Sequence, residues 1–153
     1  MKKGSLIPIG LFLALPGSMY AQVRIHIPAQ HHTTHQTIRA RVENNGRSPV
    51  TFCAEFGPDS MKATGSESLP IPFWAQKYSA GKWSTLLTGP DVGGLRGTIV
   101  LDSGESKEFP FRLNETGRMR LQLEYWSGSV ETLDCRNPPK SSKRVTSKTI
   151  VMK

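Results

Sequence analysis

The chain has 153 residues, 37% of them hydrophobic, and a formal net charge of +8. That length is typical of one domain with a substantial core, so we expect no second domain. The body, residues 22–135, holds twelve basic and twelve acidic residues, whereas residues 136–153 hold six basic residues and no acidic one. Because the body has no basic surplus, we predict no nucleic-acid partner. We interpret the basic end as solvated, with attraction to an anionic envelope or membrane surface as the alternative.

Residues 1–21 have the organisation of an export signal. Two lysines precede an apolar run from Leu6 to Leu15, a proline and a glycine then interrupt it, and Ala21 offers a small residue at which a signal peptidase could cut. The apolar run is well short of the roughly 20 residues that span a bilayer. We therefore predict cleavage near Ala21 and a mature chain of residues 22–153 that is periplasmic or secreted, with no membrane span.

The mature chain shows period-two alternation throughout and no sustained helical period. The expected strands, in chain order, are residues 23–27, 38–43, 50–56, 71–78, 83–87, 98–101, 109–113, 117–125 and 145–152. Gly57 to Pro70 and Gly89 to Gly97 are expected to be long loops. Pro110 is expected on a sheet edge or at a bulge, because proline cannot donate to a ladder. The pattern predicts an all-β fold, two packed sheets or a barrel.

Four short segments are typical of a known group of proteins. They are Val42 to Val50 with its Asn-Asn-Gly turn, Gly81-Lys82-Trp83, Leu101 to Ser106 with its Gly-Glu-Ser turn, and Gly117 to Leu121. In their order and spacing they resemble the exported immunoglobulin-like domain proteins of bacteria, over roughly residues 37–152. The resemblance implies an immunoglobulin-like antiparallel β-sandwich of seven to nine strands. It gives no activity, because the group is diverse in function. The chain departs from the group at Met119, where a tyrosine is usual.

Cys53 and Cys135 are the two cysteines of the chain. In an oxidising compartment such a pair is expected to form a disulfide. Cys53 shares its strand face with Thr51 and Glu55 and alternates with apolar residues, so we expect it to point away from the core. The sequence therefore predicts a peripheral bridge, which differs from the bridge buried between the sheets of antibody domains. A two-cysteine metal site is the alternative, but it would need further ligands that are not near either residue in sequence.

His26, His31, His32 and His35 lie within ten residues near the mature amino terminus. Imidazoles at this density could ligate Zn, Cu or Ni, and His31, His32 and His35 are the candidates. Their spacing matches no established site, and no Cys, Asp or Glu accompanies them, so we predict no metal. The sequence also has no Gly-x-Ser-x-Gly elbow, no His-Glu-x-x-His pair and no phosphate-binding glycine loop, so we predict neither an enzyme nor a cofactor.

Trp74, Tyr78 and Trp126 are candidates for an aromatic ligand platform. Trp74 and Tyr78 share one strand face, and Trp126 stands on the face opposite Tyr125 in its strand. If all three are outward and adjacent, a glycan or peptide could stack on them. The alternative is that they pack in the core or at a sheet edge.

These observations predict an exported, non-catalytic immunoglobulin-like domain with a binding or structural role in the bacterial cell envelope. Its partner would be a protein or glycan of that envelope, and the two long loops are the favoured contact regions. Two alternatives stay open. A secreted protease inhibitor would use the same loops, whereas a carbohydrate-binding module would use the aromatic platform.

Overall fold

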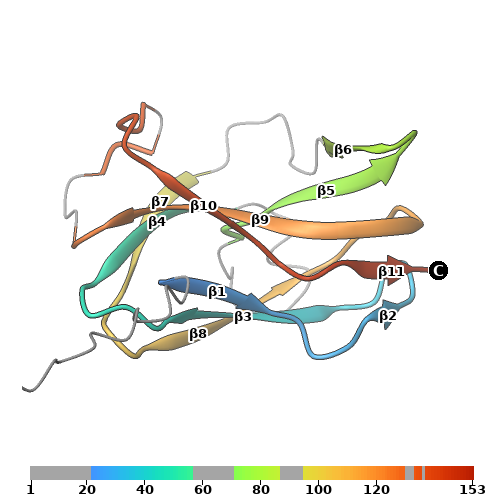
Figure 1. Cartoon of the computed structure of the whole chain (residues 1–153), viewed down its shortest axis with the longest axis horizontal. Helices are drawn as coiled ribbons and strands as arrows, with labels where there is room; N and C mark the ends of the chain where they lie inside the picture. The colour runs from blue at the N-terminus through green and yellow to red at the C-terminus, as the bar shows by residue number, and fades with distance from the viewer. Residues whose placement is uncertain (1–21, 57–70, 87–94, 130–132, 136) are drawn as a thin grey trace, which may run out of the picture.

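The computed structural model describes residues 22–56, 71–86, 95–129, 133–135 and 137–153. The expected export signal, the expected loop from Gly57 to Pro70 and residues 89–94 of the second loop lie outside these ranges. Within them the regular structure is entirely β (Figure 1). The strands are β1 Val23–His26, β2 His31–His32, β3 Ile38–Asn44, β4 Val50–Phe56, β5 Trp74–Ser79, β6 Lys82–Thr85, β7 Leu95–Leu101, β8 Ser106–Phe111, β9 Gly117–Ser127, β10 Lys143–Thr146 and β11 Ile150–Met152.

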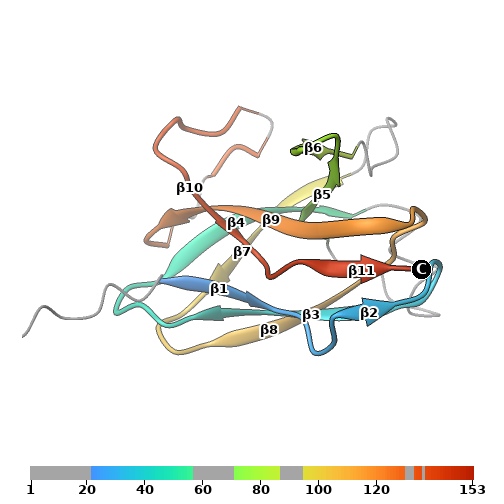
Figure 2. The ribbon, with the colours of Figure 1, turned by 45° about the vertical axis from the view of Figure 1, so that its right-hand side comes forward.

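The strands form two layers. The smaller sheet has the order β1-β3-β8, and the larger runs β2-β11-β9-β4-β7. β5 and β10 also pair with β9, and β6 pairs with β5. Figures 1 and 2 show β1, β3 and β8 as one layer below β9, β4 and β7. The chain changes layer between β3 and β4, between β7 and β8, and between β8 and β9. Apart from the parallel β2–β11 pair, both sheets are antiparallel, and these crossovers between them are those of an immunoglobulin-like β-sandwich, as predicted.

Alternation within the strands accounts for the burial of one face of each sheet. In β9, Met119, Leu121, Leu123 and Tyr125 are buried, whereas the residues between them are partly exposed. Because successive side chains of a strand point to opposite faces, the buried set faces the other layer. Four buried phenylalanines lie between the layers: Phe52, Phe73, Phe109 and Phe111. The Phe109 ring packs edge to face against the rings of Phe52 and Phe73, with 5.9 Å between ring centroids in each pair. Pro110 lies on β8, an edge strand of the smaller sheet, as predicted.

The described residues contain more strands than the seven to nine predicted, for two reasons. The expected strand 145–152 is divided into β10 and β11, and the short β2 was not predicted at all. After β1 pairs antiparallel with β3, the chain passes Pro28 and β2 pairs in parallel with β11, so the amino-terminal segment joins both sheets. The expected loop ending at Gly97 is also too long, because β7 already begins at Leu95.

Candidate binding face on β5, β6 and β9

The β5–β6 hairpin extends the larger sheet beyond β9. Ala80 and Gly81 form its two-residue turn, with φ of 49° and 80°. Positive φ at both central residues is the type I′ geometry that matches the twist of paired strands. The turn sets Tyr78 opposite Trp83, while β5 pairs with β9 so that Trp74 lies opposite Gln122. Ala75 points into the core, so its neighbours in β5 point outward.

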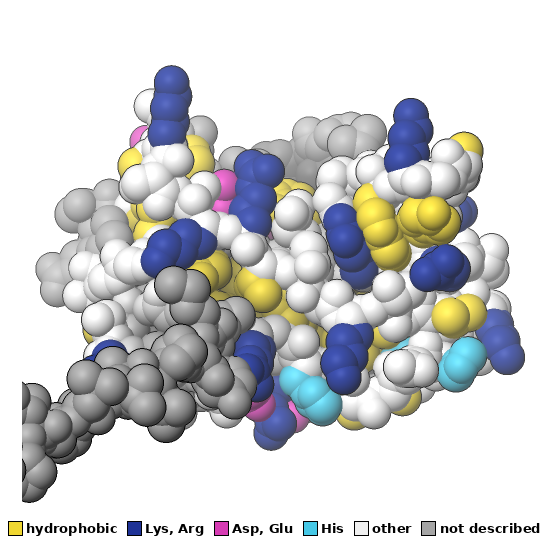
Figure 3. All heavy atoms as spheres, viewed as in Figure 1, with side chains coloured by type: hydrophobic (Ala, Val, Ile, Leu, Met, Phe, Trp, Pro, Cys, Tyr) yellow, Lys and Arg dark blue, Asp and Glu magenta, His cyan; other side chains and the backbone are white. Residues whose placement is uncertain are grey.

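The outer side of this hairpin and of β9 carries what we call the aromatic–arginine face: Trp74, Gln76, Tyr78, Trp83, Arg118, Arg120 and Gln122. Trp74 and Tyr78 are 44% and 36% exposed, which makes them two of the three large hydrophobic side chains most exposed in the described residues. Figure 3 shows hydrophobic side chains lying among Lys and Arg side chains over β5 and β6. An exposed aromatic group of this kind marks an interaction surface more often than isolated exposed residues do.

Two arginines of β9 lie over aromatic rings of the hairpin. The Arg118 guanidinium carbon is 4.9 Å from the centroid of the Tyr78 ring, and that of Arg120 is 4.3 Å from the centroid of the Trp83 ring. The centroids of the Tyr78 and Trp83 rings lie 5.2 Å apart. Each cation–π contact at an exposed site stabilises by about 0.5–1 kcal/mol. The contacts therefore restrict the guanidinium groups before any partner arrives.

A chain of hydrogen bonds orders the polar side chains between these rings. Arg120 Nε donates to Gln76 Oε1 at 2.8 Å, and Gln76 Nε2 donates to Gln122 Oε1 at 3.3 Å. This chain uses the acceptor oxygens of both amides and leaves the Gln122 amide nitrogen as a donor. Among the described residues, neither Arg118 nor Arg120 pairs with a carboxylate. The face is consequently rich in donors and positively charged.

The carboxylates closest along these strands are occupied by partners of their own. Glu124, further along β9, accepts hydrogen bonds from Ser142 and from Arg144. Glu115 forms an ion pair with Lys77 at 2.8 Å. Neither carboxylate therefore neutralises the two arginines of the face.

The prediction that Trp126 belongs to the platform is wrong. Trp126 is 4% exposed, and its indole N–H donates to the Pro139 carbonyl at 3.0 Å. It stands on the outer side of β9 as alternation requires, but the connection between β9 and β10 folds back over it. The aromatic side chains that do lie together on the outer side are Trp74 and Tyr78 with Trp83, a residue that we did not include among the candidates.

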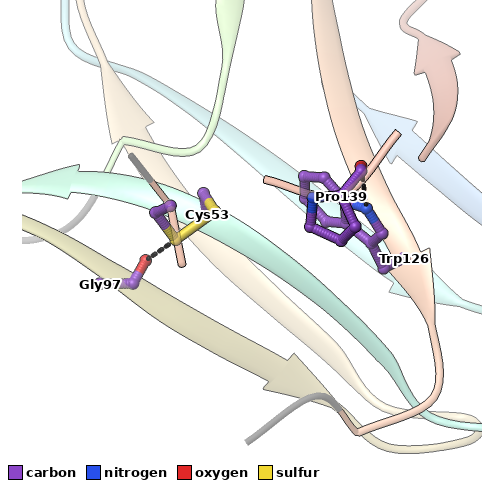
Figure 4. Close-up of a disulfide and its surroundings, with 5 residues drawn as sticks. Cys53, Gly97, Trp126 and Pro139 are labelled. Atoms are coloured by element: carbon purple, nitrogen blue, oxygen red, sulfur yellow. Dashed lines mark hydrogen bonds between the residues drawn. A yellow bond between two sulfur atoms is a disulfide. The ribbon is translucent and has the colours of Figure 1, made fainter. Parts of the chain in front are cut away.

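Cys53 and Cys135 form a disulfide, with their Cα atoms 5.7 Å apart. The bridge packs with Trp126 and Leu133 in a cluster separate from the main core, so it is peripheral, as predicted. Figure 4 shows the bridge beside the Gly97 carbonyl, which lies 3.6 Å from Cys135 Sγ, and Trp126 beside Pro139. The disulfide thus fastens the β9–β10 connection to the outer side of β4.

The histidines do not converge. His31 is exposed, whereas His32 is buried and its Nε2 lies 2.8 Å from the Ala29 carbonyl oxygen. His35 sits in the loop that follows, at a positive φ of 64°. No group of three or more potential ligands among His, Cys, Asp and Glu occurs in the described part of the chain.

Part of the aromatic–arginine face could have been predicted from the sequence. The alternation of β9 places Arg118 and Arg120 on its outer side, and the Ala80-Gly81 turn predicts that Tyr78 opposes Trp83. The missing step was the pairing of β5 with β9, which joins segments about 40 residues apart and which no local pattern specifies.

Comparison with known proteins gives no family. No family model matches the chain, and no curated protein matches it. Among solved structures it is similar to the ASH/PapD-like domain of human CEP192 (PapD-like domain 7), with 10% identity and a TM-score of 0.34 over 97% of this chain and 96% of that one. The fold assignment above rests on the strand pairing alone.

In the part of the chain that is described, no helix has the length and apolarity to cross a membrane.

Proposed function

We propose that this protein is an exported, non-catalytic binding domain of the bacterial cell envelope, and that it contacts its partner through the aromatic–arginine face. The observation that carries the proposal is the exposure of Trp74 and Tyr78 on a sheet face whose two arginines are already held in place. Interfaces draw most of their affinity from a few Trp, Tyr and Arg side chains, and this face concentrates all three types.

Export is supported by the sequence of residues 1–21 and by the disulfide. A peripheral bridge between Cys53 and Cys135 persists in an oxidising compartment such as the periplasm, but is rare in a reducing cytosol. That the domain is non-catalytic stays a prediction from the sequence, which has none of the catalytic motifs sought in it.

Carbohydrate binding is the candidate that the geometry favours among the alternatives. Trp74 is an exposed indole on an open sheet, where a sugar ring could lie flat against it. Protease inhibition has no such support, because residues 57–70 and most of residues 89–97, the two loops that it would use, lie outside the described part of the chain.

The proposal has two parts that can be tested together. Expressed with its own amino terminus, the chain should appear in the periplasmic or secreted fraction, starting near Gln22 and with no free thiol. The purified mature chain should then sediment with isolated cell envelopes. Trp74→Ala should weaken this binding about tenfold, since central aromatic contacts contribute at least about 1.4 kcal/mol.

Val100→Ala is the matched control. Val100 is a 40% exposed hydrophobic residue of β7, away from the face, and its truncation should leave envelope binding unchanged. An uncleaved chain in the cytoplasm would contradict export. Equal sedimentation of wild type and Trp74→Ala would contradict the assignment of the face.

A further inference from the structure

The polar groups of the aromatic–arginine face are mostly hydrogen-bond donors. The Gln76 oxygen already accepts from Arg120, and the Gln122 oxygen already accepts from Gln76. The two guanidinium groups of Arg118 and Arg120 together hold most of the remaining N–H groups, and the amide N–H₂ of Gln122 adds to them. A complementary partner is therefore one rich in acceptors, and guanidinium groups favour acceptors that are anionic.

The aromatic side chains of the face further restrict the kind of partner that fits it. The Tyr78 and Trp83 rings each carry a guanidinium on one side, whereas no ring or cation partner of Trp74 occurs among the described residues. The face thus presents one open indole beside a pair of positioned cations. A polymer of sugar rings, each of which can lay a face of C–H groups against an indole, with regularly spaced negative charges fits both features at once.

Two other anionic polymers fit less well. Single-stranded nucleic acid is bound by successive aromatic rings on which bases stack, and here guanidinium groups already cover two of the three rings. An acidic peptide would satisfy the arginines but would leave Trp74 without a matching flat surface. The disulfide also favours an oxidising compartment outside the cytosol, in agreement with the envelope location of the proposed function.

We propose that the aromatic–arginine face binds an acidic polysaccharide, with a sugar ring stacked on Trp74 and the carboxylate or phosphate groups of the polymer held by Arg118 and Arg120. Gln122, opposite Trp74 in the pairing of β5 with β9, donates to a hydroxyl of the stacked sugar. This inference rests on the proposed function, because it names the partner of the same face.

The test uses the mature, disulfide-bonded chain and soluble probes of known chemistry. A short oligogalacturonate, its fully methyl-esterified form and a phosphorylated mannan oligosaccharide are each titrated by calorimetry. The acidic sugars should bind, and the methyl ester, which has the same rings without charge, should bind at least about tenfold more weakly, as expected for the loss of charge-assisted hydrogen bonds. Binding should weaken when ionic strength is raised well above about 0.15 M.

Two variants separate charge from stacking. Arg118→Gln should weaken binding of the acidic sugar about tenfold, whereas Arg39→Gln, which removes an exposed arginine from β3, should not change it. Trp74→Ala should abolish detectable binding and Trp74→Phe should restore part of it, because phenylalanine keeps a stacking ring. Unchanged thermal unfolding of each variant shows that the fold is intact.

Four results would overturn the inference. The first is equal binding of the acid and its methyl ester, and the second is binding of neither acidic sugar. The third is tighter binding of an oligothymidylate than of the oligogalacturonate, which would indicate a nucleic-acid face. The fourth is binding of polyglutamate with no effect of Trp74→Ala, which would indicate charge attraction alone. In each case envelope sedimentation still tests the proposed function separately, because that assay does not depend on the identity of the ligand.

Discussion

Asn44 is a polar residue that the sandwich buries completely, at the end of β3. Its amide N–H₂ donates to the carbonyl oxygens of Ser48, Leu101 and Asp102, and its side-chain oxygen accepts from the Gly46 N–H. One side chain therefore joins the β3–β4 turn to the end of β7. Buried polar groups of this kind are costly once their partners are lost.

We predict that Asn44→Ala lowers the free energy of unfolding by about 3 kcal/mol, because it leaves buried carbonyl groups without a donor. Urea denaturation followed by tryptophan fluorescence measures the change. Asn45→Ala is the matched control, since Asn45 is exposed in the same turn and should change stability by less than about 0.5 kcal/mol. Similar effects of the two substitutions would show that the Asn44 amide has no special role.

Tyr125 is a buried residue of β9, and this burial raises the pKa of its phenol above the ordinary value of 10.0. The folded state therefore holds its proton to higher pH than the unfolded state. The stability that the neutral phenol contributes is fully present below about pH 10 and is lost as pH rises through the folded pKa. We expect unfolding midpoints to fall above that pH in wild type and to fall less in Tyr125→Phe. Tyr78→Phe, which removes an exposed phenol, should behave as wild type, and an identical alkaline loss in all three proteins would contradict the role of Tyr125.

At the scale of elements, the last strand shows how a side chain can interrupt a ladder. The Ser147 N–H donates to the Leu121 carbonyl oxygen at 2.8 Å, and its hydroxyl accepts from the Leu121 N–H at 2.9 Å. The same hydroxyl donates to the Lys148 carbonyl oxygen. These bonds stand in for regular strand pairing and separate β10 from β11. A serine within an alternating pattern gives no local signal of this, so the sequence predicted one strand.

The β9–β10 connection is the element that the disulfide controls. Replacing both cysteines, as Cys53→Ser with Cys135→Ser, should lower the free energy of unfolding by roughly 4–5 kcal/mol, because the bridge closes a loop of 82 residues in the unfolded chain. The bridge cluster is separate from the main core, so we expect the variant to form the same sandwich. Denaturation with and without a reductant measures the effect. Reduction should destabilise the wild type and leave the variant unchanged, and a wild type insensitive to reduction would contradict this role of the bridge.

For the whole molecule, alternation was sufficient to predict an all-β fold and the orientation of Cys53, whereas the immunoglobulin-like sandwich was expected from the resemblance. The all-β pattern and the Cys53 orientation both depend on which face of a strand is buried, and apolar periodicity reports that directly. Trp126 shows the limit of the same reasoning. Alternation placed it correctly on the outer side of β9, but its burial depends on a distant connection that folds over it. Trp83 and the two arginines were missed for the related reason that long-range strand pairing brings them together.

The most direct test of the binding face uses the chain's three tryptophans as internal reporters. In a nitrogen-15 correlation spectrum, each gives one indole N–H signal, and soluble polysaccharide fragments from isolated envelopes can be titrated into the sample. We expect the Trp74 and Trp83 signals to shift or broaden, while the Trp126 signal stays in place because that indole is buried and bonded to Pro139. A shift of Trp126 alone, or no shift of any indole under conditions in which the chain sediments with envelopes, would show that binding occurs elsewhere on the molecule.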